Sequence, residues 1–182
     1  MKTITNEYLE LRKQLHLNPD YGIASLAFAP FVAEIIKKAN IKTLTDYGAG
    51  KKNLLIGIQN NGITDIQYFP YDPVFPEYGE PVTSQLVCCI DVLEHIEPQL
   101  IDNVIQDLAS IITNLGFFSI HMGPAKKILA DGRNAHLIQK PCSWWLAKIV
   151  MHFEIVQLIS HQIMGNGIWM IVSPKINDEM LI

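Results

Sequence analysis

The stretch that most constrains this chain is residues 44–55, with the sequence LTDYGAGKKNLL. An apolar, β-prone segment, residues 41–47, leads into Gly48 and Gly50 and then into a segment with the apolar spacing of a helix. Glycine lets the backbone turn sharply and approach a ligand closely, where a side chain would block it. The start of the following helix offers unpaired N–H groups that suit a carboxylate or phosphate. The pattern predicts a strand, a tight turn and a helix with a ligand at the turn, although an ordinary strand-to-helix turn can share it.

Two further strands are expected to end in an acid. Residues 66–73 form a β-prone run that ends at Asp72, 26 positions after Asp46. An acid at the end of the second strand of such a unit is placed to accept hydrogen bonds from ribose hydroxyls. Residues 86–90 have the composition of a buried strand and lead directly to Asp91.

These three motifs, in this order, resemble those of the class I S-adenosylmethionine-dependent methyltransferases. Asp46-x-Gly48-x-Gly50 is similar to their first motif, Asp72 to their ribose-binding acid, and the DVLEHI run that begins at Asp91 to their fourth motif. The resemblance covers residues 21–175 and implies an enzyme whose cofactor is S-adenosyl-L-methionine. The cofactor-binding residues that it implies are Tyr21, Asp46, Tyr47, Gly48, Ala49, Gly50, Tyr71, Asp72, Pro73, Asp91 and Val92, with Gly22 and Ser25 as further candidates.

The chain departs from the family pattern in two places. Lys52 stands where the family usually has a third glycine. Only thirteen residues, 73–85, separate Asp72 from the next strand, and three of them are prolines. The family normally has a helix and a third strand there, and thirteen residues cannot hold both. We therefore expect the third strand to be shortened or missing, which leaves the adenine side of the site open.

The resemblance implies one methyltransferase domain, residues 1–182, with an N-terminal helical lid (1–40) on a Rossmann-like core (41–182). The expected fold is a doubly wound α/β sheet, mainly parallel, that ends in an antiparallel hairpin. The helices that we expect cover 5–16, a segment opened by Pro30, 52–59, a segment opened by Pro98 and closed at 114–116, and 143–151. Later strands are expected at 117–122, 153–162 and 167–174, because Asn166-Gly167 between two apolar runs is a strong hairpin signal.

A long polar loop, residues 123–137, follows the strand expected at 117–122. Connections in α/β units usually have about two to six residues, so this loop is longer than a connector needs to be. It carries three cations, Lys126, Lys127 and Arg133, and one histidine, His136. Arginine can bind a carboxylate or phosphate with two parallel hydrogen bonds, and histidine has the intrinsic pKa of a general base. A loop histidine can also serve only as an anchor for the backbone.

The run DGRNAHL, residues 131–137, resembles one found in some bacterial and phage members of the same family. With this resemblance, the catalytic candidates are His136, Arg133 and Asp91, the last of them beside the methyl group. We expect the 123–137 loop to form the acceptor site.

A second interpretation concerns Asp91-x-x-Glu94-His95. It resembles the Glu-x-x-Glu-His metal site of the RNA 2′-O-methyltransferases that modify small-RNA ends, with His136 or His121 as a remote ligand. The same run is common in methyltransferases that use no metal, and we expect none here.

Composition narrows the function. The net charge is −4, and residues 53–125 contain nine acids but no Lys or Arg, which argues against a general nucleic-acid-binding surface. No apolar run is long enough for a membrane span or a signal peptide, and three cysteines without a Cys-x-x-Cys pair indicate a reducing, cytoplasmic setting. We expect methyl transfer to a small, anionic metabolite or sugar-type acceptor. Two alternatives stay open: a methyltransferase for nucleotides or nucleic-acid ends, and a non-catalytic S-adenosylmethionine-binding regulatory module. The acceptor atom and the oligomeric state are open as well.

Overall fold

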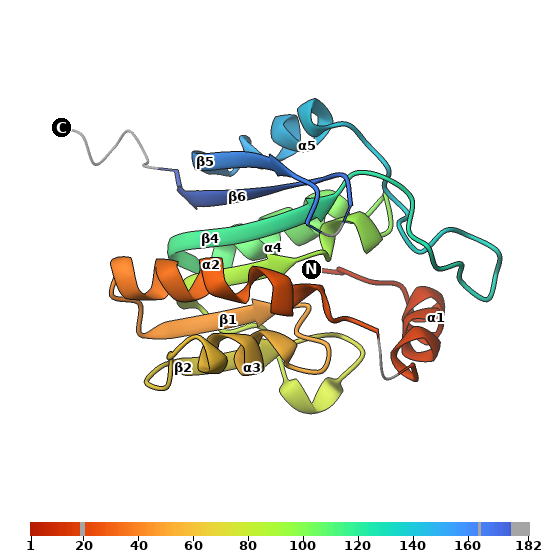
Figure 1. The fold of residues 1–182 in the computed structure, drawn as a ribbon. Helices are drawn as coiled ribbons and strands as arrows, with labels where there is room; N and C mark the ends of the chain where they lie inside the picture. Colours follow the sequence, from red (N-terminus) through yellow and green to blue (C-terminus); the bar gives the residue numbers. More distant parts are fainter. Residues whose placement is uncertain (19–20, 164, 176–182) are drawn as a thin grey trace.

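The computed structural model describes residues 1–18, 21–163 and 165–175. Their centre is a six-stranded sheet with the order β2-β1-β3-β4-β6-β5 (Figure 1). The strands are β1 (Thr43–Tyr47), β2 (Gln67–Tyr71), β3 (Ser84–Ile90), β4 (Ile112–His121), β5 (Phe153–His161) and β6 (Gly167–Pro174). β1 to β4 pair in parallel, whereas β6 is antiparallel to both β4 and β5. The expected Rossmann-like sheet with a closing antiparallel hairpin is confirmed.

Helices cover both faces of the sheet (Figure 1). On one face lie α2 (Ala24–Lys38) and α3 (Asn53–Asn60), and on the other α4 (Ile101–Ile111) and α5 (Cys142–Ile149). Neighbouring residues of β4 serve the two faces alternately: Phe117 packs in the α2 cluster and Phe118 in the α4 cluster, and neither is exposed. The remaining helix, α1 (Asn6–His16), lies beyond the carboxyl ends of the parallel strands, on the same side as the 123–137 loop.

The shortened third βα unit is confirmed. Between β2 and β3 the chain forms only a single 3₁₀ turn, Pro76–Tyr78. β2 is therefore the edge strand next to β1. In the described residues no strand pairs with the outer edge of β2. Asp72, the expected ribose-binding acid, directly follows β2 and therefore lies at this edge of the sheet.

The start of the second helix was predicted wrongly. α2 begins at Ala24, and Pro30 lies inside it rather than at its first turn. A proline in a helix interior removes the hydrogen bond to the carbonyl four residues earlier, here that of Leu26. The burial of neighbouring residues of α2 outweighs this loss, because the side chains of Phe28 and Ala29 are completely inaccessible to solvent.

The expected turn at 114–116 was also wrong. α4 begins at Ile101, three residues later than expected, and passes at Ile112 directly into β4. Residues 112–116 are already strand because they pair with β3, although a bulge interrupts the register between Ser84 and Leu86. Pairing with a distant strand thus decides the secondary structure of residues 112–116, although their local sequence favours a turn.

The terminal elements agree with expectation. The sequence predicts Thr5 as the cap of the first helix and either Trp144 or Trp145 as the residue that packs inward from the helix at 143–151. Thr5 caps α1 by accepting a hydrogen bond from the N–H of Tyr8, and Trp145 of α5 is the tryptophan that is buried. The β5–β6 hairpin turns over residues 162–166, of which residue 164 lies outside the described part. The sequence NPDYG at 18–22 predicts a turn, and its residues 19 and 20 also lie outside the described part. No helix in the described ranges combines the length and apolarity needed to cross a membrane.

Candidate functional site

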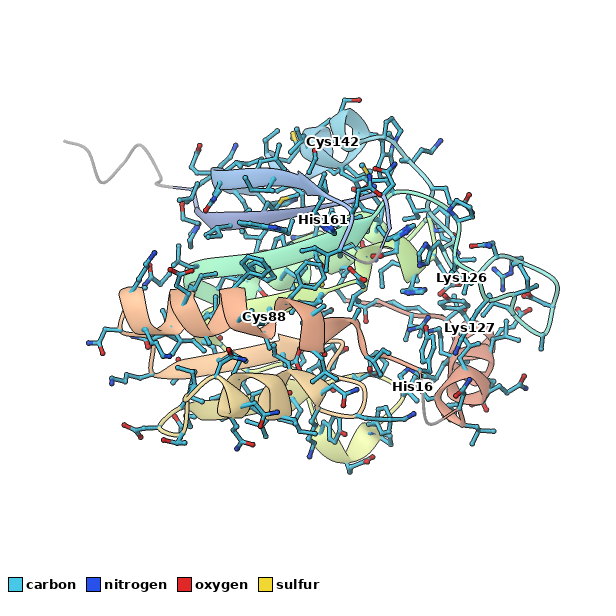
Figure 2. The ribbon with its side chains drawn as sticks, viewed as in Figure 1. His16, Cys88, Lys126, Lys127, Cys142 and His161 are labelled. Atoms are coloured by element: carbon cyan, nitrogen blue, oxygen red, sulfur yellow. The ribbon has the colours of Figure 1, made fainter. Side chains whose placement is uncertain are left out.

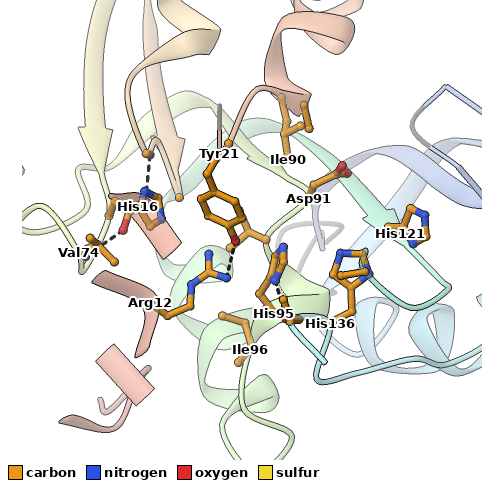
Figure 3. A pocket seen from close by; sticks show the side chains of 18 of the residues that line it. Arg12, His16, Tyr21, Val74, Ile90, Asp91, His95, Ile96, His121 and His136 are labelled. Carbon is orange, nitrogen blue, oxygen red and sulfur yellow. Dashed lines mark hydrogen bonds between the residues drawn. The ribbon is translucent and has the colours of Figure 1, made fainter. Parts of the chain in front are cut away.

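A cavity of about 670 Å³ opens at the carboxyl ends of the parallel strands (Figure 3). It is bounded by the loops after β1, β2 and β3, by α1, by the start of α2 and by the 123–137 loop. The predicted residues that line it are Tyr21, Gly22, Ser25, Asp46, Tyr47, Gly48, Ala49, Gly50, Asp72, Pro73, Asp91, Val92, Lys126, Lys127 and His136. Tyr71 and Arg133 are not among the lining residues.

The loop after β1 is held to β2 by backbone hydrogen bonds. The N–H groups of Gly48 and Ala49 both donate to the carbonyl of Tyr71, at 2.7 and 2.9 Å. Gly48 has a φ of +86°, and a Cβ there would lie 2.3 Å from Cγ2 of Val92. Glycine is thus required at this position both by conformation and by space. Tyr71 supports the loop through its backbone, while its ring packs against that of Tyr47 with centroids 4.7 Å apart.

Lys52, in place of a third glycine, also adopts a left-handed conformation, with φ +62° and ψ +31°. For a residue with a side chain this conformation costs roughly 1–2 kcal/mol. Its Nζ lies 4.5 Å from the centre of the Tyr78 ring, a cation–π contact that offsets part of the cost. The loop therefore keeps the backbone shape that a glycine would give.

Asp72 is fixed by two backbone amides. The N–H of Gly50 donates to its Oδ2 at 3.0 Å, and the N–H of Val74 donates to its Oδ1 at 2.9 Å. Burial raises the pKa of this carboxyl, although both amides and the nearby Arg12 guanidinium lower it. Each oxygen keeps a further lone pair, so the carboxylate can accept two more hydrogen bonds from a ligand in the cavity. A vicinal diol has this complementary pattern of donors.

Asp46 is almost completely buried beneath the same loop. The hydroxyl of Tyr68 donates to its Oδ2 at 2.5 Å. Burial raises the pKa of Asp46 to about 7, and the neighbouring Asp72 contributes to the increase. A cation that enters the cavity would favour the charged carboxylate, because an opposite charge within a few ångströms stabilises the ionised form.

Asp91 stands at the end of β3 with a φ of +52°, which is uncommon for a residue with a side chain. Ser119 of β4 holds it there: its hydroxyl donates to Oδ1 of Asp91 at 2.6 Å, and its carbonyl accepts the N–H of Asp91 at 3.0 Å. Such strained residues are frequent at ligand sites. The Asp91 side chain faces the cavity from the edge of β3 (Figure 3).

Three histidines form a row along one wall. The ring of His136 lies 4.7 Å from that of His95 and 4.8 Å from that of His121, centre to centre (Figure 3). Nδ1 of His136 is 2.8 Å from the carbonyl of Gly123. A carbonyl only accepts, so this nitrogen carries the proton and Nε2 of the neutral ring is free to accept one. Burial lowers the pKa of His136, which favours this neutral form.

Arg133 was predicted to face the cofactor, and the structure does not bring it to the cavity. Its Nη2 lies 2.6 Å from Oδ2 of Asp131, to which its Nε also donates, at 2.7 Å. The guanidinium lies over the ring of Tyr8, 5.6 Å from its centre, beside a second, smaller hollow that Thr5 and Glu97 also line. The short turn at 131–133 directs the side chain back onto its own loop.

Sequence reasoning missed Arg12, which is the arginine that lines the cavity. Its Nη1 donates to the hydroxyl of Tyr21 at 2.7 Å, and Lys127 places its Nζ 4.6 Å from the centre of the same ring. Among the described residues, neither cation has a carboxylate oxygen within 4.0 Å. Figure 2 shows Lys126 and Lys127 on the same side of the molecule as His16 of α1. One signal in the sequence could have revealed that α1 lines the cavity. An expected helix carries Tyr8, Arg12 and His16 at every fourth position, which places them on one side of it.

The metal-binding alternative gains no support. Glu94 is completely buried, and its Oε1 accepts the N–H of His121 at 2.8 Å. Burial raises the pKa of Glu94 well above its usual range, which favours the neutral form of this side chain. Nδ1 of His95 is 2.7 Å from the carbonyl of Ala135. Across the described residues, no group of three or more His, Cys, Asp or Glu side chains could hold a metal ion.

The fold is similar to that of solved methyltransferases. The 1,6-didemethyltoxoflavin-N1-methyltransferase of Burkholderia thailandensis, crystallised with 1,6-didemethyltoxoflavin and S-adenosylhomocysteine, matches with a TM-score of 0.65 and 12% identity over 97% of this chain and 92% of that chain. The N-methyltransferase NodS of Bradyrhizobium japonicum WM9, in complex with S-adenosylhomocysteine, matches with a TM-score of 0.53 and 9% identity over 94% and 100%. An O-methyltransferase family protein of Burkholderia thailandensis matches with a TM-score of 0.57 and 12% identity, and this chain covers 55% of its length.

No protein-family model and no curated protein matches the sequence. At identities of 9–12%, the structural similarity is one of fold. The chain has the Rossmann-like fold of these methyltransferases.

Proposed function

We propose that this protein is an S-adenosylmethionine-dependent methyltransferase whose acceptor is a small anionic molecule. The proposal rests on one observation: a single cavity is lined by residues suited to bind the cofactor and by a residue suited to deprotonate the acceptor. Asp72 offers two free acceptor positions beside the glycine loop, and His136 offers an unprotonated Nε2 on the opposite wall. The shared fold of solved methyltransferases supports this assignment.

The residues on the cofactor side fit the groups of S-adenosyl-L-methionine. Asp72 would accept hydrogen bonds from the two ribose hydroxyls. The backbone of Gly48 and Gly50 would lie against the methionyl part, since no side chain blocks the approach there. Asp46 would lie near the positively charged ammonium, which would lower its raised pKa and keep it ionised. The bound cofactor supplies an electrophilic methyl group.

On the acceptor side, Nε2 of His136 would take the proton of an acceptor hydroxyl or amine as the acceptor atom bonds to the methyl carbon and the bond from that carbon to the sulfonium sulfur breaks. The Nδ1–H group of His136 keeps donating its hydrogen bond to the carbonyl of Gly123, so the ring keeps its orientation. The Asp91 carboxylate would stabilise the imidazolium that forms, as its charge already favours protonation of His136. Arg12, Lys126 and Lys127 would bind the negative charge of the acceptor.

The cofactor assignment is tested by calorimetry with S-adenosylhomocysteine. Asp72→Ala should weaken binding by at least about 1.5 kcal/mol, or more than tenfold, since hydrogen bonds to charged groups contribute about 1.5–3 kcal/mol. Glu77→Ala is the matched control, because Glu77 is an acid of the neighbouring 3₁₀ turn that does not line the cavity. Equal affinities for the two variants would contradict the assignment.

The acceptor assignment is tested by transfer of labelled methyl groups from S-adenosylmethionine to fractionated small metabolites. We expect label in the acidic fraction. With the acceptor recovered, His136→Gln should abolish turnover and leave S-adenosylhomocysteine binding intact, whereas Arg133→Ala should leave both unchanged. Label that appears only in an added RNA or nucleotide fraction would favour a nucleic-acid-end methyltransferase. Cofactor binding without label in any fraction would indicate a non-catalytic binding module.

A further inference from the structure

His16, the last residue of α1, lines the cavity at Gly50, next to Asp72. Its Cε1 lies 3.5 Å from the point where a Cβ on Gly50 would stand. Its ring is edge-on to two aromatic rings, those of Tyr21 at 4.9 Å and Phe75 at 5.3 Å. Figure 3 shows His16 and Val74 at the same end of the cavity. None of the roles proposed above uses this side chain.

Both ring nitrogens of His16 are buried, and neither has a hydrogen-bond partner among the described residues. A buried polar group without a partner costs about 1–3 kcal/mol, so native structures rarely leave one. Three other buried side chains of the described part have an unpaired atom, namely Glu94, Trp145 and His161, and none of them lines the cavity. His16 is therefore the place where a ligand in the cavity can supply the missing bonds.

The charge state of His16 limits what that ligand group can be. Burial and the cations Arg12, Lys51 and Lys127 lower the pKa of His16 to about 4, so the ring is neutral near pH 7. A neutral imidazole has one donor and one acceptor nitrogen, which suits a hydroxyl or a nitrogen heterocycle. A carboxylate would instead bind the charged guanidinium of Arg12, one helical turn earlier.

The surroundings of His16 suit a flat heterocycle attached to a sugar. Asp72, which offers its free acceptor positions to a diol, is hydrogen-bonded to the same Gly50 that His16 covers. Beyond Asp72 the described residues add no further strand to the sheet, and the 3₁₀ turn stands there with the rings of Phe75 and Tyr78 stacked at 5.2 Å. Tyr78 is tied to the loop, since its hydroxyl donates to the carbonyl of Gly50 at 3.0 Å.

We propose that His16 binds the adenosine half of the cofactor and, from α1, closes the side of the site that the missing third strand leaves open. This inference rests on the proposed function. It adds a contact from an N-terminal helix to a nucleoside whose sugar is held by Asp72.

The test compares two ligands by calorimetry: S-adenosylhomocysteine, and 5′-methylthioadenosine, which has the adenosine but lacks the amino-acid part. His16→Phe keeps a ring of similar size and removes both nitrogens. We expect it to weaken both ligands by the same factor, at least fivefold. His152→Phe is the matched control, since His152 lies outside the cavity, and it should change neither affinity. His16→Gln retains a donor and an acceptor and should lose less than His16→Phe.

Each result has a distinct meaning. If His16→Phe weakens only S-adenosylhomocysteine, His16 serves the amino-acid part and the inference is wrong. If neither affinity changes while the wild-type protein binds both ligands, the inference fails and the proposed function stands. If the wild-type protein binds neither ligand, the proposed function itself fails. Should His16→Phe not fold, as judged by its melting temperature, His16→Met makes the same comparison without an aromatic ring.

Discussion

Gly48→Ala is the substitution that most directly tests the geometry of the glycine loop. The added Cβ would lie 2.3 Å from Cγ2 and 3.2 Å from Cγ1 of Val92, so that side chain must move. The φ of +86° adds a conformational cost of about 1–2 kcal/mol, and forcing an extra carbon into a packed site costs typically 1–3 kcal/mol. The expected loss of about 2–5 kcal/mol corresponds to a melting temperature roughly 4–20 °C lower, at about 2–4 °C per kcal/mol for a chain of this size.

Gly79→Ala separates the two costs. Gly79 has a φ of +76°, but nothing lies within 4 Å of an added Cβ, so only the conformational cost applies. Thermal unfolding followed by circular dichroism should show a loss of about 1–3 kcal/mol for Gly79→Ala, because its φ of +76° and ψ of −156° form a pair that is almost confined to glycine, and a larger loss for Gly48→Ala, which adds the clash with Val92. Because Val92 lines the cavity, Gly48→Ala should also weaken S-adenosylhomocysteine binding, and Gly79→Ala should not. Equal melting temperatures for the two variants would refute the close packing of Val92 on the loop.

Three further outcomes are expected. Pro30→Ala should increase the free energy of unfolding by about 1–3 kcal/mol and raise the melting temperature, because it restores one hydrogen bond inside α2. A lower melting temperature would contradict the position of Pro30 inside the helix. The folded pKa of His16 lies below its unfolded value of about 6.5, so its stabilisation is present above pH 6.5 and is lost as the pH falls toward 4. Melting temperatures measured over this range should therefore fall more steeply for the wild type than for His16→Phe, and parallel curves would contradict the burial of His16. Glu97→Ala should remove two hydrogen bonds from Thr5, at 2.8 Å each, and lower the melting temperature, whereas Gln99→Ala should have little effect.

Much of the fold could be predicted because its signals are local. The glycine turn after β1, the Asn-Gly hairpin and the cap at Thr5 each depend on residues close together in the chain. The shortened third unit was predictable from chain length alone, since thirteen residues cannot hold a helix and a strand. The misplaced elements are those that distant contacts decide. Pro30 stays inside α2 because Phe28 is buried, and residues 112–116 are strand because β3 pairs with them.

The lining of the cavity was predictable where residues lie at the ends of strands, and not where a loop or a helix folds over them. Asp46, Asp72 and Asp91 line the cavity because parallel strands end at one edge of a sheet. Arg133 was expected there from its place in a loop that overhangs this edge, but a loop can turn any one side chain away. The hydrogen bonds of Arg133 to Asp131, two residues earlier, direct it to the outside.

The position of α1 links the two halves of the site. One side of the helix presents Arg12 and His16 to the cavity, while Leu11 and Leu15 pack with Leu129 of the 123–137 loop. α1 is therefore supported by this loop and also by the segment after β3, because Tyr8 donates to the carbonyl of His95 and Thr5 donates to Glu97. In the proposed function the same loop also carries the acceptor residues. A loop displaced by a poorly fitting acceptor would withdraw support from His16 and so loosen the adenosine, whereas a fitting acceptor would hold both in place.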